Sequence, residues 1–269
     1  MTTHARTLWG LGILASVIVL IALSAGSAHA TVVSKPLEYK IGSDAFEGTI
    51  AFDDKATTPR PGVLVVHQWM GPTAHEFTVA NHLAALGYVA FVADIYGKGV
   101  RPKNPDEAGA QAGKFKNDRG LFRARAAGAL EALKSQPQVD PAKVAVIGYC
   151  FGGMGALELA RSGAPLLGVV SFHGTLNNPT PADARNIQGK VLVLHGEADP
   201  FVKADEVAAF KKEMDDAGVT YTFIGYPGAV HAFTQKSAGF DPSKGAAYNA
   251  SADVKSWQAM KDFLAEIFA

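Results

Sequence analysis

Residues 148–153, with the sequence Gly-Tyr-Cys-Phe-Gly-Gly, contain Cys150, the only cysteine of this 269-residue chain. The apolar run before it, 143–147, predicts a buried strand, and residues 154–161 predict a helix. Glycines two residues before and after Cys150 permit a sharp turn that lifts the thiol clear of the sheet. Free N–H groups at the start of the helix would then favour a thiolate. This pattern predicts a nucleophile; the alternative is a small cysteine buried in a core strand.

Two further segments supply an acid and a histidine. Residues 191–195 predict a strand that ends shortly before Asp199, and the loop after a strand predicted at 221–224 carries His231. The order nucleophile, acid, histidine is that of the α/β-hydrolase triad, and chymotrypsin-like and subtilisin-like proteases have other orders. In such a triad His231 would take the thiol proton and Asp199 would fix the histidine tautomer. Glu197 and Asp205 are alternative acids that fit the strand end less well.

These motifs resemble those of the dienelactone hydrolase family, whose members use a cysteine nucleophile. The resemblance implies an α/β-hydrolase fold, a triad of Cys150, Asp199 and His231, and hydrolysis of a carboxylic ester or lactone through a thioester, without a cofactor. The N–H of Phe151, directly after the nucleophile, is expected to bind the oxyanion. The family match places the second oxyanion donor at Trp69. The segments that carry the resemblance are residues 65–71, 91–97, 148–153, 195–199 and 228–233.

The resemblance also indicates where substrate would bind, and two positions depart from the family pattern. Gln68 stands where the family often has a glutamate, and Gln235 stands where dienelactone-cleaving members have an arginine. Lys98 and Arg101 are the cations available in the loop after the strand ending near Asp94. Phe233 is a candidate wall of the pocket and equally a candidate core residue. The neutral Gln235 predicts that uncharged esters or lactones are turned over at least as well as an anionic dienelactone.

The elements that must position these residues alternate between strand and helix. Strands are expected at 47–52 (an edge strand), 63–67 and 88–92, besides those named above. Helices are expected at 73–86, around 122–133, around 207–214 and at 256–268. Strict alternation predicts a doubly wound, mostly parallel sheet with helices on both faces and ligands bound at the carboxyl ends of its strands. Residues 97–118 show no clear pattern and are interpreted as a lid or binding loop.

The first thirty residues predict a cleavable signal peptide. A short basic region precedes an apolar run from Leu8 to Leu23, and Ala28-His-Ala30 is a small-residue cleavage site. The remaining 31–269 are expected to form one domain, periplasmic or secreted, with no stable membrane association after cleavage and no oligomer beyond the monomer. An uncleaved membrane anchor is the alternative.

Composition and motifs exclude several other functions. Lysine plus arginine number 25 and aspartate plus glutamate 25, with no basic tract, so no nucleic-acid partner is expected. No HExxH-like pattern occurs, and His67, His173 and His195 are interpreted as core histidines, so no metal site is predicted. The partner is a small-molecule ester or lactone. Thioester hydrolysis or acyl transfer, an inactive binding protein on the same scaffold and a redox-sensing thiol remain as alternatives.

Overall fold

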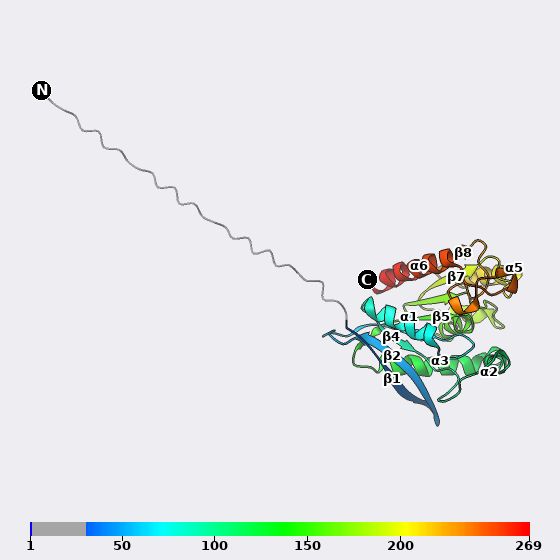
Figure 1. Cartoon of the computed structure of the whole chain (residues 1–269), viewed down its shortest axis with the longest axis horizontal. Coiled ribbons are helices and arrows are strands. Elements are labelled where there is room, and N and C mark those ends of the chain that lie inside the picture. The colour runs from blue at the N-terminus through cyan, green and yellow to red at the C-terminus, as the bar shows by residue number, and fades with distance from the viewer. Residues whose placement is uncertain (2–30) are drawn as a thin grey trace.

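The computed structural model describes Met1 and residues 31–269, so the predicted signal peptide lies outside the described part except for its first residue. Within residues 31–269 the chain forms one eight-stranded sheet in the order β1-β2-β4-β3-β5-β6-β7-β8 (Figure 1). The strands are β1 (Val32–Ile41), β2 (Asp44–Asp53), β3 (Arg60–Val66), β4 (Val89–Val92), β5 (Val139–Tyr149), β6 (Gly168–Phe172), β7 (Lys190–Gly196) and β8 (Tyr221–Tyr226).

Helices cover both faces of this sheet. The helices are α1 (Ala74–Ala85), α2 (Pro105–Asn117), α3 (Arg119–Lys134), α4 (Phe151–Arg161), α5 (Ala204–Ala217) and α6 (Ala250–Phe268). Buried side chains of α1 and α6 belong to one apolar cluster, and those of α3, α4 and α5 belong to the other. Along β3, Val63 and Val65 face the first cluster while Leu64 and Val66 face the second. The strand is therefore a continuous apolar run because both of its faces are covered.

The strands from β3 to β8 are all parallel, and β1 and β2 pair antiparallel at one side. The predicted α/β-hydrolase architecture is therefore confirmed. The prediction of an edge strand at 47–52 is wrong. β2 is an inner strand because β1, from Val32 to Ile41, pairs along its whole length and takes the edge.

The segment 97–118, interpreted as an irregular lid or binding loop, contains helix α2. Asn104 caps this helix by accepting a hydrogen bond from the Glu107 N–H at 2.9 Å, and Pro105 occupies the first turn. Its buried face consists of Ala108, Ala112 and Phe115. The interpretation of the whole segment as irregular is wrong because two of these three residues are alanines, which give only a weak apolar pattern.

A buried ionic network anchors α4, the helix that follows Cys150. Arg161 is fully buried, and its guanidinium donates to both carboxylate oxygens of Glu213 at 2.8 and 2.9 Å. Arg161 also donates to Glu158 at 3.2 Å, and Arg123 donates to the other oxygen of Glu158 at 2.8 Å. Each buried charge has an opposite partner, as buried charges require. The network ties α4 to α3 and α5 on one face of the sheet.

Of the helices in the described part of the chain, none is both long and apolar enough to cross a membrane.

Candidate active site

Cys150 occupies a strained turn between β5 and α4. Its backbone angles are φ 55° and ψ −117°, a conformation that residues other than glycine rarely adopt. A Cβ added at Gly148 would lie 1.9 Å from the carbonyl oxygen of Gly152, and one at Gly152 would lie 2.1 Å from the carbonyl oxygen of Val66. Only glycine fits at either position. The two glycines thus allow the chain to turn tightly enough to present the thiol beyond the sheet.

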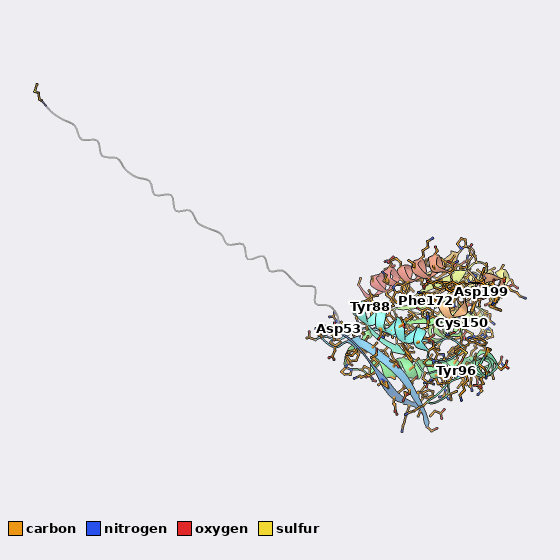
Figure 2. All side chains as sticks on the ribbon, in the orientation of Figure 1. Asp53, Tyr88, Tyr96, Cys150, Phe172 and Asp199 are labelled. Atoms are coloured by element: carbon orange, nitrogen blue, oxygen red, sulfur yellow. The ribbon has the colours of Figure 1, made fainter. Side chains whose placement is uncertain are left out.

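Asp199 and His231 come from the loops after β7 and β8, at the same end of the sheet as Cys150. The imidazole of His231 lies between the other two side chains. Its Nε2 is 3.0 Å from the Cys150 Sγ, and its Nδ1 is 2.8 Å from the Asp199 Oδ2. Figure 2 marks Cys150 and Asp199 within the fold. The three residues predicted as a triad are therefore brought together in hydrogen-bonded order.

The backbone holds both loops in place. The second oxygen of Asp199 accepts the Phe201 N–H at 2.8 Å, so the carboxylate cannot rotate freely. The backbone of His231 pairs with residues 245–247. Its N–H donates to the Gly245 carbonyl at 3.1 Å, and its carbonyl accepts the Ala247 N–H at 3.0 Å. Both partners of the thiol are thus oriented by contacts outside the triad.

Electrostatics in the site favour a thiolate paired with an imidazolium. Burial opposes ionisation of Cys150, but the charge and hydrogen bond of His231, together with the Phe151 N–H, lower the pKa of the thiol below its usual value. Burial likewise opposes the charged form of His231, yet the thiolate and Asp199 raise the pKa of His231 to about 10. The shifts have opposite signs because each charge stabilises the other.

Two backbone N–H groups predicted to bind an oxyanion lie on adjacent elements. The Phe151 N–H is the first of α4, and it helps to lower the pKa of the Cys150 thiol. Trp69 lies in the turn after β3, and β3 runs beside β5 with Val66 opposite Gly148. The hydroxyl of Tyr96 donates to the Trp69 carbonyl at 2.7 Å.

The predicted substrate contacts divide into two groups. Gln68, Phe233 and Gln235 are buried, and no hydrogen-bond partner lies near the Gln235 Nε2 within the described residues. Lys98 and Arg101 are engaged elsewhere. Lys98 pairs with Glu38 at 2.6 Å, and Arg101 pairs with Asp94 at 3.3 Å while donating to three backbone carbonyls. A role for these two cations in substrate binding stays a prediction.

The three histidines interpreted as core residues, His67, His173 and His195, are buried, and the ring of His173 packs against His231 of the triad. His173 is fully buried, its ring centroid lies 5.3 Å from that of His231, and its Nε2 lies 2.9 Å from the Thr234 hydroxyl. Burial holds the pKa of His173 well below its usual value, so this ring is neutral beside the charged His231. Within residues 31–269 no group of three His, Cys, Asp or Glu side chains has the arrangement of a metal site.

Sequence reasoning missed Glu76, a fully buried carboxylate next to the turn after β3 that carries Gln68 and Trp69. It accepts the Gln68 N–H at 3.3 Å and both the N–H and the hydroxyl of Thr73, at 2.9 and 2.6 Å. The signal that could have revealed it is the spacing Thr73-x-x-Glu76 before a helical pattern, which is a capping box.

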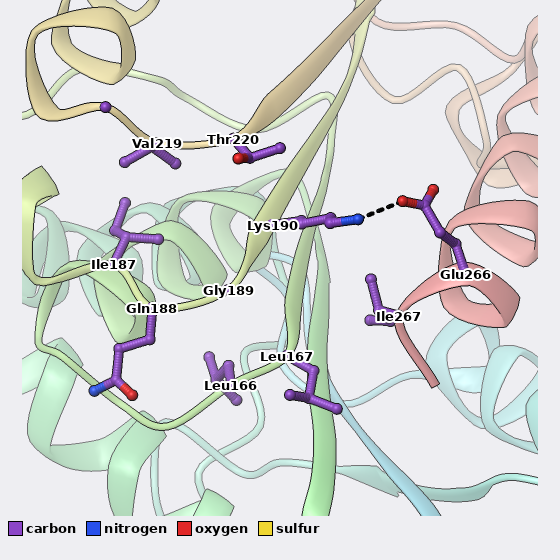
Figure 3. A pocket seen from close by; sticks show the side chains of 11 residues that line it. Leu166, Leu167, Ile187, Gln188, Gly189, Lys190, Val219, Thr220, Glu266 and Ile267 are labelled. Atoms are coloured by element: carbon purple, nitrogen blue, oxygen red, sulfur yellow. Dashed lines mark hydrogen bonds and ion pairs between the residues drawn. The ribbon is translucent and has the colours of Figure 1, made fainter. Parts of the chain in front are cut away.

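A cavity of about 460 Å³ lies at the opposite end of the sheet (Figure 3). Lys190 begins β7 there and pairs with Glu266 of α6. Because the thiol lies beyond the carboxyl ends of the strands, this cavity is separate from the site of Cys150.

Comparison with known proteins gives a consistent result. The family model described as the dienelactone hydrolase family matches residues 46–268. A carboxymethylenebutenolidase homologue from Aquifex aeolicus is 31% identical over 195 residues, which are 68% of this chain and 82% of that protein.

Solved structures agree with the family match. The dienelactone hydrolase-like promiscuous phosphotriesterase P91, from metagenomic libraries, is 38% identical, with a TM-score of 0.85 over 88% of this chain and 99% of that one. A structure called m3DLH is 36% identical, with a TM-score of 0.84 over the same shares of the two chains. The protein is thus an ester- or lactone-cleaving hydrolase, and it belongs to the dienelactone hydrolase family.

Proposed function

We propose that this hydrolase cleaves its substrate through a Cys150–His231–Asp199 triad and a thioester acyl-enzyme. The observation that carries the proposal is the single imidazole that reaches the Cys150 sulfur at 3.0 Å and the Asp199 carboxylate at 2.8 Å. Cys150 is a partly exposed residue, which leaves a path for substrate toward the thiol. The strained backbone of Cys150 is a further sign of function, since such conformations cluster at active sites.

The reaction follows from this geometry. The Cys150 thiolate attacks the carbonyl carbon of the ester, and the resulting oxyanion accepts hydrogen bonds from the Phe151 and Trp69 N–H groups. Collapse breaks the bond to the leaving alkoxide, which takes the proton from His231, and leaves a thioester on Cys150. Neutral His231 then removes a proton from water, whose oxygen attacks the thioester. Collapse of the second oxyanion releases the carboxylic acid and restores the thiolate–imidazolium pair.

Trapping the acyl-enzyme tests this scheme directly. Mixing the protein with excess p-nitrophenyl acetate and quenching in acid within milliseconds to seconds is expected to add one acetyl group to the peptide containing Cys150. Hydroxylamine should remove the adduct because thioesters react with it readily. Intact-mass and peptide mass spectrometry measure both results. An acetyl group found on another residue during turnover, with Cys150 unmodified, would contradict the scheme.

The surroundings of His231 favour a substrate without negative charge. The Phe201 ring is 60% exposed and lies edge-on to His231, with centroids 5.4 Å apart. The same ring lines a cleft of about 440 Å³ whose charged lining residues are the cation Lys203 and the acids Asp205, Glu206 and Glu213. An apolar group can cover Phe201 there, whereas an anion would meet three acids and one cation. The neutral Gln235 supports the same conclusion.

The preference for neutral substrates can be measured. We expect kcat/KM for a neutral aryl acetate to equal or exceed that for an anionic dienelactone. Gln235→Arg should raise kcat/KM for the anionic lactone by roughly ten- to a hundred-fold, because it adds a charge-assisted contact in a partly buried site. Gln235→Met is the matched control, since it alters the same buried position without adding charge. A wild-type enzyme that strongly prefers the anionic lactone, and that Gln235→Arg leaves unchanged, would show that another cation binds the carboxylate.

We further propose that residues 1–30 direct export and are removed, which leaves a periplasmic or secreted enzyme. The support is the pattern of a basic start, an apolar run and Ala28-His-Ala30. Mass spectrometry of the protein isolated from the bacterial envelope is expected to show a mature N-terminus at or near Thr31. Membrane-associated protein that keeps Leu8–Leu23 would indicate an anchor instead.

A further inference from the structure

The turn after β3 contains one peptide group whose orientation decides whether the oxyanion can be bound. This group joins Gln68 to Trp69, so the Gln68 carbonyl and the Trp69 N–H belong to the same rigid plane. In a trans peptide the two bonds point in opposite directions. A contact that fixes the Gln68 carbonyl therefore also fixes the direction of the Trp69 N–H.

Two donors fix that carbonyl. The His67 Nδ1 lies 2.6 Å from the Gln68 oxygen, and the Gly71 N–H donates to the same oxygen at 3.1 Å. The tautomer of His67 is set from its other side, because the ring Nε2 accepts the Ile95 N–H at 3.2 Å. The single proton of the neutral ring must then lie on Nδ1, where it donates to the Gln68 carbonyl.

The ring of His67 has no room to turn. The residue is fully buried, and its ring packs against Tyr96 at 4.7 Å and Phe151 at 5.9 Å between centroids. Burial lowers the pKa of His67 to about 4, so the ring stays neutral around pH 7. The same imidazole thus touches the residue that follows the nucleophile and holds the peptide that precedes Trp69.

Two further backbone groups of the turn are held by hydrogen bonds, and the Trp69 N–H is not. Glu76 accepts the Gln68 N–H at 3.3 Å, and Tyr96 donates to the Trp69 carbonyl at 2.7 Å. The Trp69 N–H donates to no other group within residues 31–269. This turn packs closely against the turn that carries Cys150, because a Cβ added at Gly152 would lie 2.6 Å from the His67 carbonyl oxygen.

We propose that His67 is a positioning residue, which orients the Gln68–Trp69 peptide so that the free Trp69 N–H binds the oxyanion formed at Cys150. His67 touches no substrate atom in this role and acts only through the peptide. The proposal rests on the function proposed above, with Cys150 as the nucleophile. It gives a role to a histidine whose sequence context indicated only a core position.

Two variants separate positioning from packing. In His67→Asn the side-chain amide can take the place of Nδ1 and still donate to the Gln68 carbonyl. In His67→Gln the amide reaches the position of Nε2, where it can accept the Ile95 N–H but not hold the carbonyl. Each variant keeps one of the two hydrogen bonds, so losses of thermal stability should be similar. We expect His67→Gln to lower kcat roughly ten- to a hundred-fold with KM little changed, and His67→Asn to keep kcat within about threefold.

Two further measurements show which step is affected. A trifluoromethyl ketone that forms a tetrahedral adduct with Cys150 should bind His67→Gln more weakly, by the same factor as the loss in kcat. Alkylation of Cys150 by iodoacetamide forms no oxyanion, so its rate should change less than about twofold. Equal losses of kcat in the Asn and Gln variants, or alkylation that slows together with kcat, would overturn the proposal.

The wild-type protein provides a test that does not depend on folding of a variant. Nitrogen NMR of the imidazole should show His67 protonated on Nδ1 and unprotonated on Nε2 at pH 7. The opposite tautomer would overturn the proposal because Nδ1 could not donate. Full activity of Cys150→Ala would instead refute the proposed function, and it would do so whatever the tautomer of His67.

Discussion

Cys150→Ala is expected to lower kcat/KM for esters by at least roughly 10⁴-fold while the protein stays folded. The loss should be this large because the variant has no atom that can form the acyl-enzyme. The fold should survive because the residue is partly exposed and the hydrogen bond of its thiol is to His231 rather than to the core. An esterase assay and far-UV circular dichroism on the same preparation measure the two results.

Cys150→Ser is the closer comparison, since it keeps a nucleophile of similar shape. It should also be severely impaired, because a hydroxyl is a far weaker acid than a thiol and would not exist as the anion beside His231. Substantial hydrolysis by Cys150→Ala would refute the assignment of Cys150 as the nucleophile. Activity of the serine variant close to that of wild type would refute only the need for a preformed thiolate.

The second large effect concerns the pH at which the thiol ionises. Wild-type Cys150 should react with iodoacetamide well below the pKa of about 8.5 of a free cysteine. His231→Ala removes the charge and the hydrogen bond that lower the pKa of the Cys150 thiol. Burial remains, and it raises that pKa. Labelling of this variant should therefore begin only at or above the pH expected for free cysteine. Alkylation rates measured from pH 5 to pH 11 define both curves.

His82→Ala is a suitable control for that experiment, because His82 is exposed near the end of α1 and makes no contact with the triad. Its labelling curve should match that of wild type. A wild-type curve identical to that of free cysteine would show that the resting enzyme holds a neutral thiol. Such a result would indicate that the thiolate–imidazolium pair does not form in the resting enzyme when Gln68 replaces the glutamate that the family often has at that position.

Much of this site could be predicted because the nucleophile, acid and histidine each follow a strand. Cys150, Asp199 and His231 occupy loops that share one end of a parallel sheet, and alternation of strands with helices already predicted that arrangement. The sharp turn could be predicted as well, since glycines placed two residues before and after a cysteine, between a strand and a helix, are typical of a nucleophile elbow. Local patterns were sufficient here because each signal lies within a few residues.

Other features depend on contacts between distant segments, and no local pattern reports them. β1 alternates weakly and contains Pro36, and it becomes a strand by pairing with β2. The pairing of Lys98 with Glu38 depends on β1 as well. The tautomer of His67 is fixed by a backbone group of Ile95, 28 residues away, which the sequence of the β3 turn alone does not indicate.

The backbone angles of Cys150 carry a consequence for how this enzyme can evolve. A side chain at a φ of 55° costs on the order of 1–3 kcal/mol relative to a relaxed backbone, and glycine would avoid most of that cost. Under the proposed mechanism, a mutation to glycine at this position would make the protein more stable and catalytically dead. Selection for heat resistance alone would therefore favour loss of the thiol, and the turn keeps its cysteine only while hydrolysis is itself under selection.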